Sequence, residues 1–156
     1  MTLDAIDLRI LRALQQEARL SNVALAEQVG LSQSPCLRRV RILEEAGVIR
    51  GYTALVDQTK VGLPVSVFVS IKLEKQREEA LNRFEEAMRG CPEVLECYLM
   101  TGPRDYLLRV VCRDLADYER FVKETLTRID GVASIESSFA LGQVKHTNAL
   151  PIGSAS

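Results

Sequence analysis

Three arginines, Arg38, Arg39 and Arg41, lie close together in the first third of the chain. No acidic residue occurs between positions 31 and 42, so this stretch is predicted to carry three uncompensated positive charges. Arginine fits pairs of phosphate oxygens and the edge of guanine, and serine or glutamine can reach phosphate or adenine. These residue types therefore indicate contact with DNA. The alternative is a solvated charged helix face, since charge runs are common on exposed helices.

Two helices joined by a tight turn would position these arginines. Ser21 can cap the first helix, because its hydroxyl can accept a hydrogen bond from an amide of the open first turn. Gly30 ends that helix, since glycine tolerates the left-handed backbone that follows a last turn. Leu31 is predicted to fill the angle between the helices. A further helix within residues 3–19, with apolar residues at helical spacing, is predicted to support the pair.

The second helix of the pair carries the arginines. Ser34 is predicted to cap it and Pro35 to take its first position, where the missing N–H of proline costs nothing. Three apolar residues at helical spacing are predicted to form its buried face: Leu37, Val40 and Leu43. Gly47 is predicted to end the helix. Branched residues around Gly51 predict two short strands within residues 48–57, so the unit is predicted to be a winged helix-turn-helix spanning residues 1–60.

The predicted DNA contacts come from the two helix starts and the arginine cluster. They are Ser21, Asn22, Ser32, Gln33, Ser34, Pro35, Arg38, Arg39 and Arg41. A helix-turn-helix, here expected at about residues 21–46, places such side chains in the major groove of double-stranded DNA.

The bulk composition limits where DNA affinity can come from. The chain has 156 residues and a net charge of −1, so it is no polycation. DNA affinity is therefore expected from a local patch, multiplied by oligomerisation. The sequence holds no run of about 18 apolar residues that would predict a membrane span. It also lacks a basic and then apolar start of the kind that marks a signal peptide, so a cytoplasmic location is expected.

Four cysteines raise the question of a metal site. Cys36, Cys91, Cys97 and Cys112 form no C-x-x-C pair, and the single histidine, His146, lies far along the chain. Structural zinc sites use closer spacing, so small buried or half-buried apolar residues are the preferred interpretation. No disulfide is expected in a reducing cytosol. Neither a metal nor a cofactor is predicted.

Residues 61–156 have a different pattern, after a polar linker at residues 57–64 that contains glycine and proline. Strict alternation of apolar and polar residues predicts a strand over residues 64–73, and similar patterns predict five further elements. These are a helix at 78–90, strands at 94–100 and 105–112, a helix at 115–129 and a strand at 133–141. This β-α-β-β-α-β order predicts a ferredoxin-like domain, so the whole chain is predicted to be an α+β protein.

The two predicted helices can cover only one face of that sheet. The other face is expected to carry Phe68, either Tyr98 or Tyr106, and several aliphatic residues. An apolar face of this kind usually meets another chain. Self-association is therefore predicted for the second domain, with residues 144–147 as a candidate extra edge strand.

The chain resembles the Lrp/AsnC family of bacterial and archaeal regulators, and most closely its leucine-responsive branch. The matching phrases are LDAIDLRILRALQQEARLSNVALAEQVGLS, SPCLRRVRILEEAGVIRGYTALVD and TGPRDYLLRVV, and the resemblance covers essentially the whole chain. It implies transcriptional regulation by DNA binding. It also implies a second domain that binds an amino-acid effector and pairs sheet against sheet in homodimers, which assemble into tetramers or octamers.

The loop around Gly102 is the candidate effector site. Its glycine exposes backbone N–H groups that could hold a carboxylate, and Asp105 could hold an ammonium group. The alternative from the residues alone is a plain hairpin with a solvated Asp105. The resemblance implies effector contacts from Met100, Thr101, Gly102, Arg104, Asp105, Tyr106, Leu115, Ser138, Phe139 and Ala140. Many family members carry an acidic and an aromatic residue where this chain has Pro103 and Arg104. Arg104 adds positive charge at the mouth of the site, which leaves room for a polar or acidic amino acid as the effector in place of leucine.

Two other functions are alternatives to an effector-controlled regulator. An architectural protein would wrap DNA with little ligand control. An enzyme, or the regulatory subunit of an amino-acid-metabolic enzyme, would use the same sheet-and-helix domain. The sequence has no nucleophile elbow, no phosphate loop and no G-x-G-x-x-G motif, so catalysis is not predicted.

Overall fold

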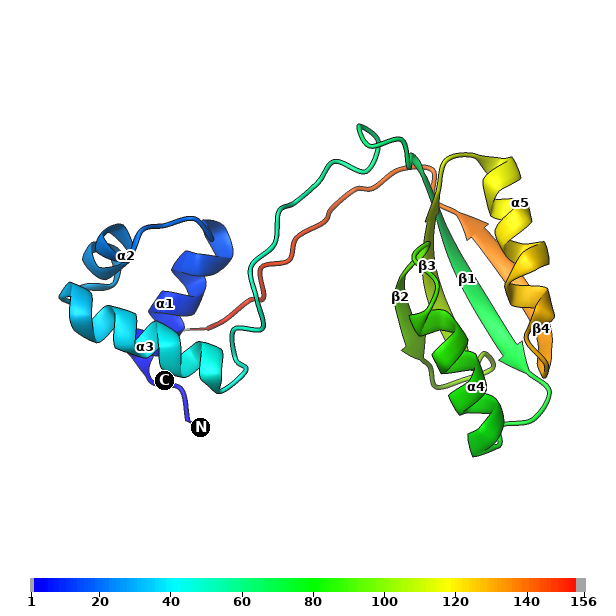
Figure 1. Cartoon of the computed structure of the whole chain (residues 1–156), viewed down its shortest axis with the longest axis horizontal. Helices are drawn as coiled ribbons and strands as arrows, with labels where there is room; N and C mark the ends of the chain where they lie inside the picture. The colour runs from blue at the N-terminus through cyan, green and yellow to red at the C-terminus, as the bar shows by residue number, and fades with distance from the viewer. Residues whose placement is uncertain (1, 154–156) are drawn as a thin grey trace. The chain divides into compact units, whose positions relative to one another are not determined.

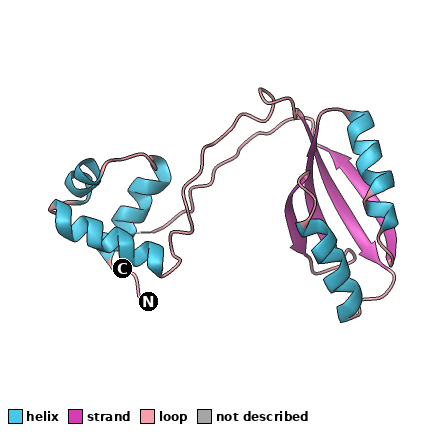
Figure 2. Ribbon diagram, viewed as in Figure 1, coloured by secondary structure: helices cyan, strands magenta, loops and turns pink. Residues whose placement is uncertain are grey.

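The computed structural model describes residues 2–153. The chain divides into two compact units, and Figure 1 labels the elements of each. Helices build the first unit, whereas the sheet belongs to the second, as Figure 2 shows. No helix of residues 2–153 is long and apolar enough to cross a membrane.

Three helices form the first unit: α1 (Ala5–Gln16), α2 (Asn22–Val29) and α3 (Gln33–Glu45). The predicted cap of α2 is confirmed, because the Ser21 hydroxyl accepts a hydrogen bond from the Ala24 amide at 3.1 Å. Gly30 ends α2 with a left-handed φ of 74°, as predicted. The helices share one apolar core that includes Ile10, Leu11, Leu25, Val29 and Leu43.

The start and the buried face of α3 differ from the prediction. The helix cap is Ser32, two residues before the predicted Ser34, so Pro35 lies inside the first turn. Cys36 is fully buried, whereas Leu37 is 39% exposed. The buried face therefore runs through Cys36, Val40 and Leu43, one residue out of phase with the predicted face at its start.

The predicted wing strands are not formed. Residues 48–57, all of which the structure describes, contain no strand. The amides of Val48 and Ile49 donate to the Leu43 carbonyl and so complete the end of α3. Residues 51–57 have exposed side chains, so the branched residues of this stretch have no apolar surface to pack on within one chain.

A four-stranded antiparallel sheet and two helices form the second unit. The strands are β1 (Val65–Leu73), β2 (Val94–Leu99), β3 (Tyr106–Cys112) and β4 (Val132–Phe139), in the spatial order β2-β3-β1-β4. The helices α4 (Glu78–Arg89) and α5 (Leu115–Glu124), with the short 3-10 helix η1 (Leu126–Arg128), complete the predicted ferredoxin-like order.

Both helices pack on the same face of the sheet, because they share one core with its inward-facing strand residues. Inward strand residues such as Val67, Val69 and Leu108 meet Phe84 of α4 and Phe121 of α5, as the alternation predicts. Figure 1 shows the two helices beside the sheet.

The opposite sheet face is not covered by the helices and carries both aromatic and polar side chains. Phe68 and Tyr98 lie on it and are 40% and 54% exposed. Tyr106, the other predicted aromatic residue, is instead buried in the helix-covered core. Polar groups also cross this face, since Arg109 pairs with Glu96 at 3.3 Å.

The end of the chain belongs to the first unit, which corrects the predicted boundaries. The division falls after Leu55 and again before Val144, so residues 144–153 belong to the unit of the helix-turn-helix rather than to that of the sheet. Residues 144–147 form no edge strand. Ile152 instead contacts the apolar core of the first unit.

Candidate DNA interface and ligand site

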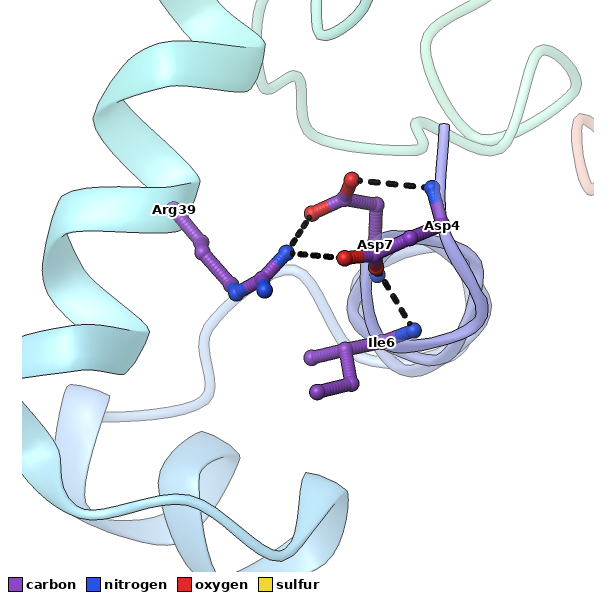
Figure 3. A network of polar contacts seen from close by, with 4 residues as sticks. All are labelled: Asp4, Ile6, Asp7 and Arg39. Atoms are coloured by element: carbon purple, nitrogen blue, oxygen red, sulfur yellow. Dashed lines mark hydrogen bonds and ion pairs between the residues drawn. The ribbon is translucent and has the colours of Figure 1, made fainter. Parts of the chain in front are cut away.

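Arg39 lies between α3 and the start of α1. Its Nη1 atom donates to Asp4 Oδ2 and to Asp7 Oδ1, both at 2.8 Å, as Figure 3 shows. Asp4 and Asp7 also cap α1 reciprocally, since each carboxylate accepts the backbone N–H of the other residue. The three side chains therefore form one clasp, named here the Arg39 clasp, which fixes α3 against α1.

The hydrogen bonds of the clasp favour the charged forms of Asp4 and Arg39. The pKa of the Asp4 carboxyl is lowered, mainly by the backbone N–H of Asp7 and further by Arg39. The hydrogen bonds that Arg39 donates to Asp7 and Asp4 raise the pKa of its guanidinium. Asp7 is buried, and removing Arg39 would leave a buried carboxylate without its partner. Arg39 is thus compensated, contrary to the prediction of three free positive charges.

Arg38 and Arg41 remain available to a ligand. Both are exposed, and neither pairs with an acidic side chain among residues 2–153. Ser34, Arg38 and Arg41 are spaced four and three residues apart, so they follow one stripe of α3 on the side away from Cys36. This stripe has the charge and hydrogen-bonding groups that phosphate and base edges require.

The start of α3 adds further polar groups. Ser32, Gln33, Ser34 and Pro35 are all exposed, and the open amides of a helix start favour phosphate. Asn22 has a different task, because its Nδ2 donates to the Gln33 carbonyl at 2.9 Å and ties α2 to α3. Three of the nine predicted DNA contacts thus make internal hydrogen bonds through their side chains, namely Ser21, Asn22 and Arg39.

Asp105 is not solvated, and the plain hairpin alternative is wrong on that point. It is 3% exposed, its Oδ2 accepts the Leu73 amide at 2.7 Å, and its Oδ1 accepts a hydrogen bond from Gln76 Nε2. Lys72 Nζ lies 3.8 Å from the same carboxylate. Asp105 therefore ties the start of β3 to the end of β1, and its oxygens are occupied in this chain.

Two other members of the predicted effector site also have internal partners. Tyr106 is buried, its ring lies 4.6 Å from that of Phe84, and its hydroxyl donates to Glu85 at 2.8 Å. Burial, followed by the effect of Glu85, raises the Tyr106 pKa, so the phenol stays protonated. Arg104 donates to Ser134 and pairs with Glu136, so its positive charge is neutralised.

The remaining effector residues are exposed, but they lie at two different ends of the sheet. Ile71 of β1 pairs with Tyr106, so the loop of residues 100–105 lies at the C-terminal end of β1. Phe68 pairs with Ser138, and Ala140 donates to the Ser66 carbonyl, so residues 138–140 lie near its N-terminal end. At about 3.3 Å per residue the two groups are separated by roughly 10–20 Å.

Leu115 belongs with the second group. It begins α5, soon after Cys112, which pairs with Val65 at the start of β1, and its side chain is 65% exposed. The exposed predicted residues thus fall into a loop group and a strand-end group. The loop group is Met100, Thr101 and Gly102, and the strand-end group is Leu115, Ser138, Phe139 and Ala140. One chain does not bring these groups together.

The cysteines and possible metal ligands give no further site. All four cysteines are free thiols, and burial raises the pKa of each. Raised pKa values keep thiols protonated and unreactive at neutral pH. Among the residues that the structure describes, no His, Cys, Asp and Glu side chains cluster as metal ligands.

The sequence interpretation missed the residues that hold these sites in place. Asp4, Asp7 and Gln76 are not among the predicted site residues. A usable signal for the Arg39 clasp does exist, since Arg39 lies three residues after Cys36 and four before Leu43. No comparable local signal marks Asp105, because its partners, Leu73 and Gln76, lie at and just beyond the end of β1, about 30 residues earlier in the chain.

An exposed arginine stripe on a helix-turn-helix, joined to a separate ferredoxin-like unit, defines a two-domain DNA-binding regulator. The family descriptions that match are "Winged helix-turn-helix DNA-binding" over residues 3–50 and "Lrp/AsnC ligand binding domain" over residues 66–150. The chain belongs to the Lrp/AsnC family of transcriptional regulators. It regulates transcription by binding DNA and is not an enzyme.

Similar proteins cover nearly the whole chain. The Bkd operon transcriptional regulator of Pseudomonas aeruginosa is 53% identical over 150 residues, which are 96% of this chain and 98% of that protein. The leucine-responsive regulatory protein of Rhizobium meliloti is 44% identical over 143 residues, 92% of each chain. A crystal structure of a Neisseria meningitidis transcriptional regulator in complex with L-Met has a TM-score of 0.91 and 43% identity, covering 96% of this chain and 97% of that one.

Proposed function

We propose that DNA binding by this regulator is controlled by a free apolar amino acid, bound by the second unit. The observation that carries this proposal is the full-length similarity, in sequence and structure, to a regulator that binds L-Met. A second relative is named for its response to leucine. As a regulator of transcription, the protein would act in the cytoplasm.

The charges of the loop favour an apolar ligand over an acidic one. Arg104 was the residue that left room for a polar or acidic effector. Its guanidinium is paired with Glu136 and Ser134, so it offers no free charge to an acidic side chain. The ligand's own carboxylate could use the exposed backbone around Gly102, whose φ of 100° favours glycine. Asp105 is buried, each of its oxygens already accepts a hydrogen bond, and it would support that backbone rather than hold the ligand's ammonium group.

The complete ligand site would need two copies of the chain. The loop group and the strand-end group lie toward opposite ends of β1, too far apart for one amino acid to touch both. A second copy could bring its strand-end group to the loop group of the first. We therefore propose a homodimer as the smallest unit, which assembles further into a tetramer or octamer.

A titration of DNA binding with the twenty amino acids tests the proposal. The full chain is bound to a duplex selected from a random pool, and protection of that duplex is measured with each amino acid. Methionine or leucine should change the protection, and calorimetry should detect their binding. Binding of aspartate or glutamate alone would contradict the apolar class. Protection of the duplex that is unchanged by all twenty amino acids would favour an architectural role without ligand control.

A matched pair of variants locates the site. Gly102→Val should abolish methionine binding in calorimetry, because it removes the backbone approach and strains a left-handed position. Gly62→Val, which also replaces a left-handed glycine in an exposed turn, controls for strain alone. Equal loss of binding in both variants would show that backbone strain, and not the loop, is responsible.

A further inference from the structure

The C-terminal segment is attached to α1 by a reciprocal pair of hydrogen bonds. The Leu150 amide donates to Gln15 Oε1 at 2.6 Å, and Gln15 Nε2 donates back to the Leu150 carbonyl at 3.2 Å. One side-chain amide thus binds both backbone groups of one residue. This arrangement fixes the segment in a single register on the last turn of α1.

Neighbouring residues strengthen the attachment. Ile152 packs against the apolar core of the first unit, and Arg12 Nη2 donates to the Gly153 carbonyl at 3.5 Å. The segment also has its own local structure, since the Ile152 amide donates to the Leu150 carbonyl at 2.8 Å around Pro151. Residues 149–153 are therefore a docked element with both polar and apolar contacts.

Helix α1 contacts other segments of the first unit at both of its ends. The start of α1 holds α3 through the Arg39 clasp, and the end of α1 holds residues 149–153. Residues 140–148 connect this segment to the end of β4 in the second unit. The first unit is thus joined to the second unit at Leu55–Val56 and again at Gln143–Val144.

We propose that residues 149–153 are an intramolecular latch that gives the DNA-reading unit its second tether. Two tethers restrict the positions that the unit can sample more than one flexible linker does. In a protein that binds two half-sites at once, this restriction raises the effective concentration of the second reading unit at its half-site. The DNA consequence rests on the proposed homodimer, whereas the latch itself does not.

A double-mutant cycle on the full-length protein tests the latch. Gln15→Ala removes both reciprocal hydrogen bonds, and a chain ending at Asn148 removes the docked segment. Each change should speed amide hydrogen exchange in the last two turns of α1, by about fivefold for each hydrogen bond lost. Combining them should add nothing beyond the truncation, because both remove one contact. Gln16→Ala, one position along and exposed, is the control and should leave exchange unchanged.

DNA binding provides the second readout. The affinities for duplexes with one and with two half-sites are compared in the parent, the Gln15→Ala variant and the control. The advantage of two half-sites should shrink in Gln15→Ala and persist in Gln16→Ala, while affinity for one half-site is unchanged.

Three results would overturn the latch or its role. Unchanged exchange in both single variants, or strictly additive effects in the combined variant, would show that no latch exists. An unchanged two-site advantage would show that the latch does not restrict the reading unit. A parent without any two-site advantage would instead refute the homodimer, and the exchange experiment would still decide the latch.

Discussion

The helix α3 and the loop of residues 100–106 differ in how many of their predicted ligand-binding charges stay exposed. Each was expected to offer a charged residue to a ligand. In each, one of these residues makes hydrogen bonds within the protein instead. Arg39 binds Asp4 and Asp7. Asp105 binds the Leu73 amide and Gln76. On α3, Arg38 and Arg41 stay exposed. In the loop, the other charge, Arg104, is paired as well.

The difference follows from the geometry of the two elements. A helix turns its residues outward at a fixed period, so burying one arginine leaves those one position before and two after it exposed. A loop between two strands has no such period, and its side chains face whatever the neighbouring strand presents. A charged motif on a helix therefore predicts a surface more safely than a charged motif in a strand connection.

The largest expected effect comes from Asp105. Asp105→Ala should destabilise the second unit by about 3 kcal/mol, because the buried Leu73 amide and the Gln76 side chain lose their acceptor. Urea unfolding measures the change. Asp130→Ala removes a carboxylate whose side chain is 90% exposed, and it should change stability by less than about 0.5 kcal/mol. Equal effects of the two substitutions would restore Asp105 as a free ligand group.

A smaller effect is expected from the Arg39 clasp. Arg39→Ala should destabilise the first unit by about 2 kcal/mol, since buried Asp7 loses its charged partner. Arg38→Ala removes the same charge from the exposed stripe, and its effect on stability should stay within about 0.5 kcal/mol. The difference is measured as the shift of the unfolding midpoint. If Arg38→Ala were the more destabilising change, the assignment of the two arginines would be reversed.

Most of the fold could be predicted from the sequence. The alternation in residues 64–73 predicted β1, and the helical spacing predicted α4 and α5, each within a few residues of the observed bounds. Local periodicity carries this information because it fixes which face of each element is apolar. The absent wing could not be predicted locally, since it depends on the use of Val48 and Ile49 to close α3.

The candidate sites were harder to predict from the sequence than the fold. On α3 the predicted face started at Leu37, the larger apolar residue, whereas the small Cys36 is the one that fits the core. That shift of one residue turned Arg39 inward. The role of Asp105 depends on β1 lying beside β3, and that of residues 149–153 on a contact with Gln15 about 135 positions away in the chain. Such long-range partners leave no trace in local periodicity.

The smallest expected effect concerns the far end of α3. The Tyr52 hydroxyl donates to Glu44 at 2.9 Å, and burial together with Glu44 raises the Tyr52 pKa to about 12. A raised tyrosine pKa favours the protonated folded state. Its contribution to stability is therefore complete below pH 10 and is lost as the pH rises toward 12.

Ultraviolet titration of the parent against Tyr52→Phe isolates this group. The difference signal should have its midpoint near 12, and Glu44→Gln should move the midpoint toward 10. A parent midpoint near 10 would mean that the Tyr52–Glu44 hydrogen bond does not hold the end of α3.

The salt dependence of DNA affinity tests most directly whether α3 reads DNA with its outer stripe. Arg38→Gln, Arg41→Gln and Arg39→Gln each remove one positive charge, and each is compared with the parent at a temperature where circular dichroism shows it folded. Loss of a phosphate contact should flatten the slope of log affinity against log salt by about one unit. The expected result is a flatter slope for Arg38→Gln and Arg41→Gln and the parent slope for Arg39→Gln. A slope flattened only by Arg39→Gln would contradict the account.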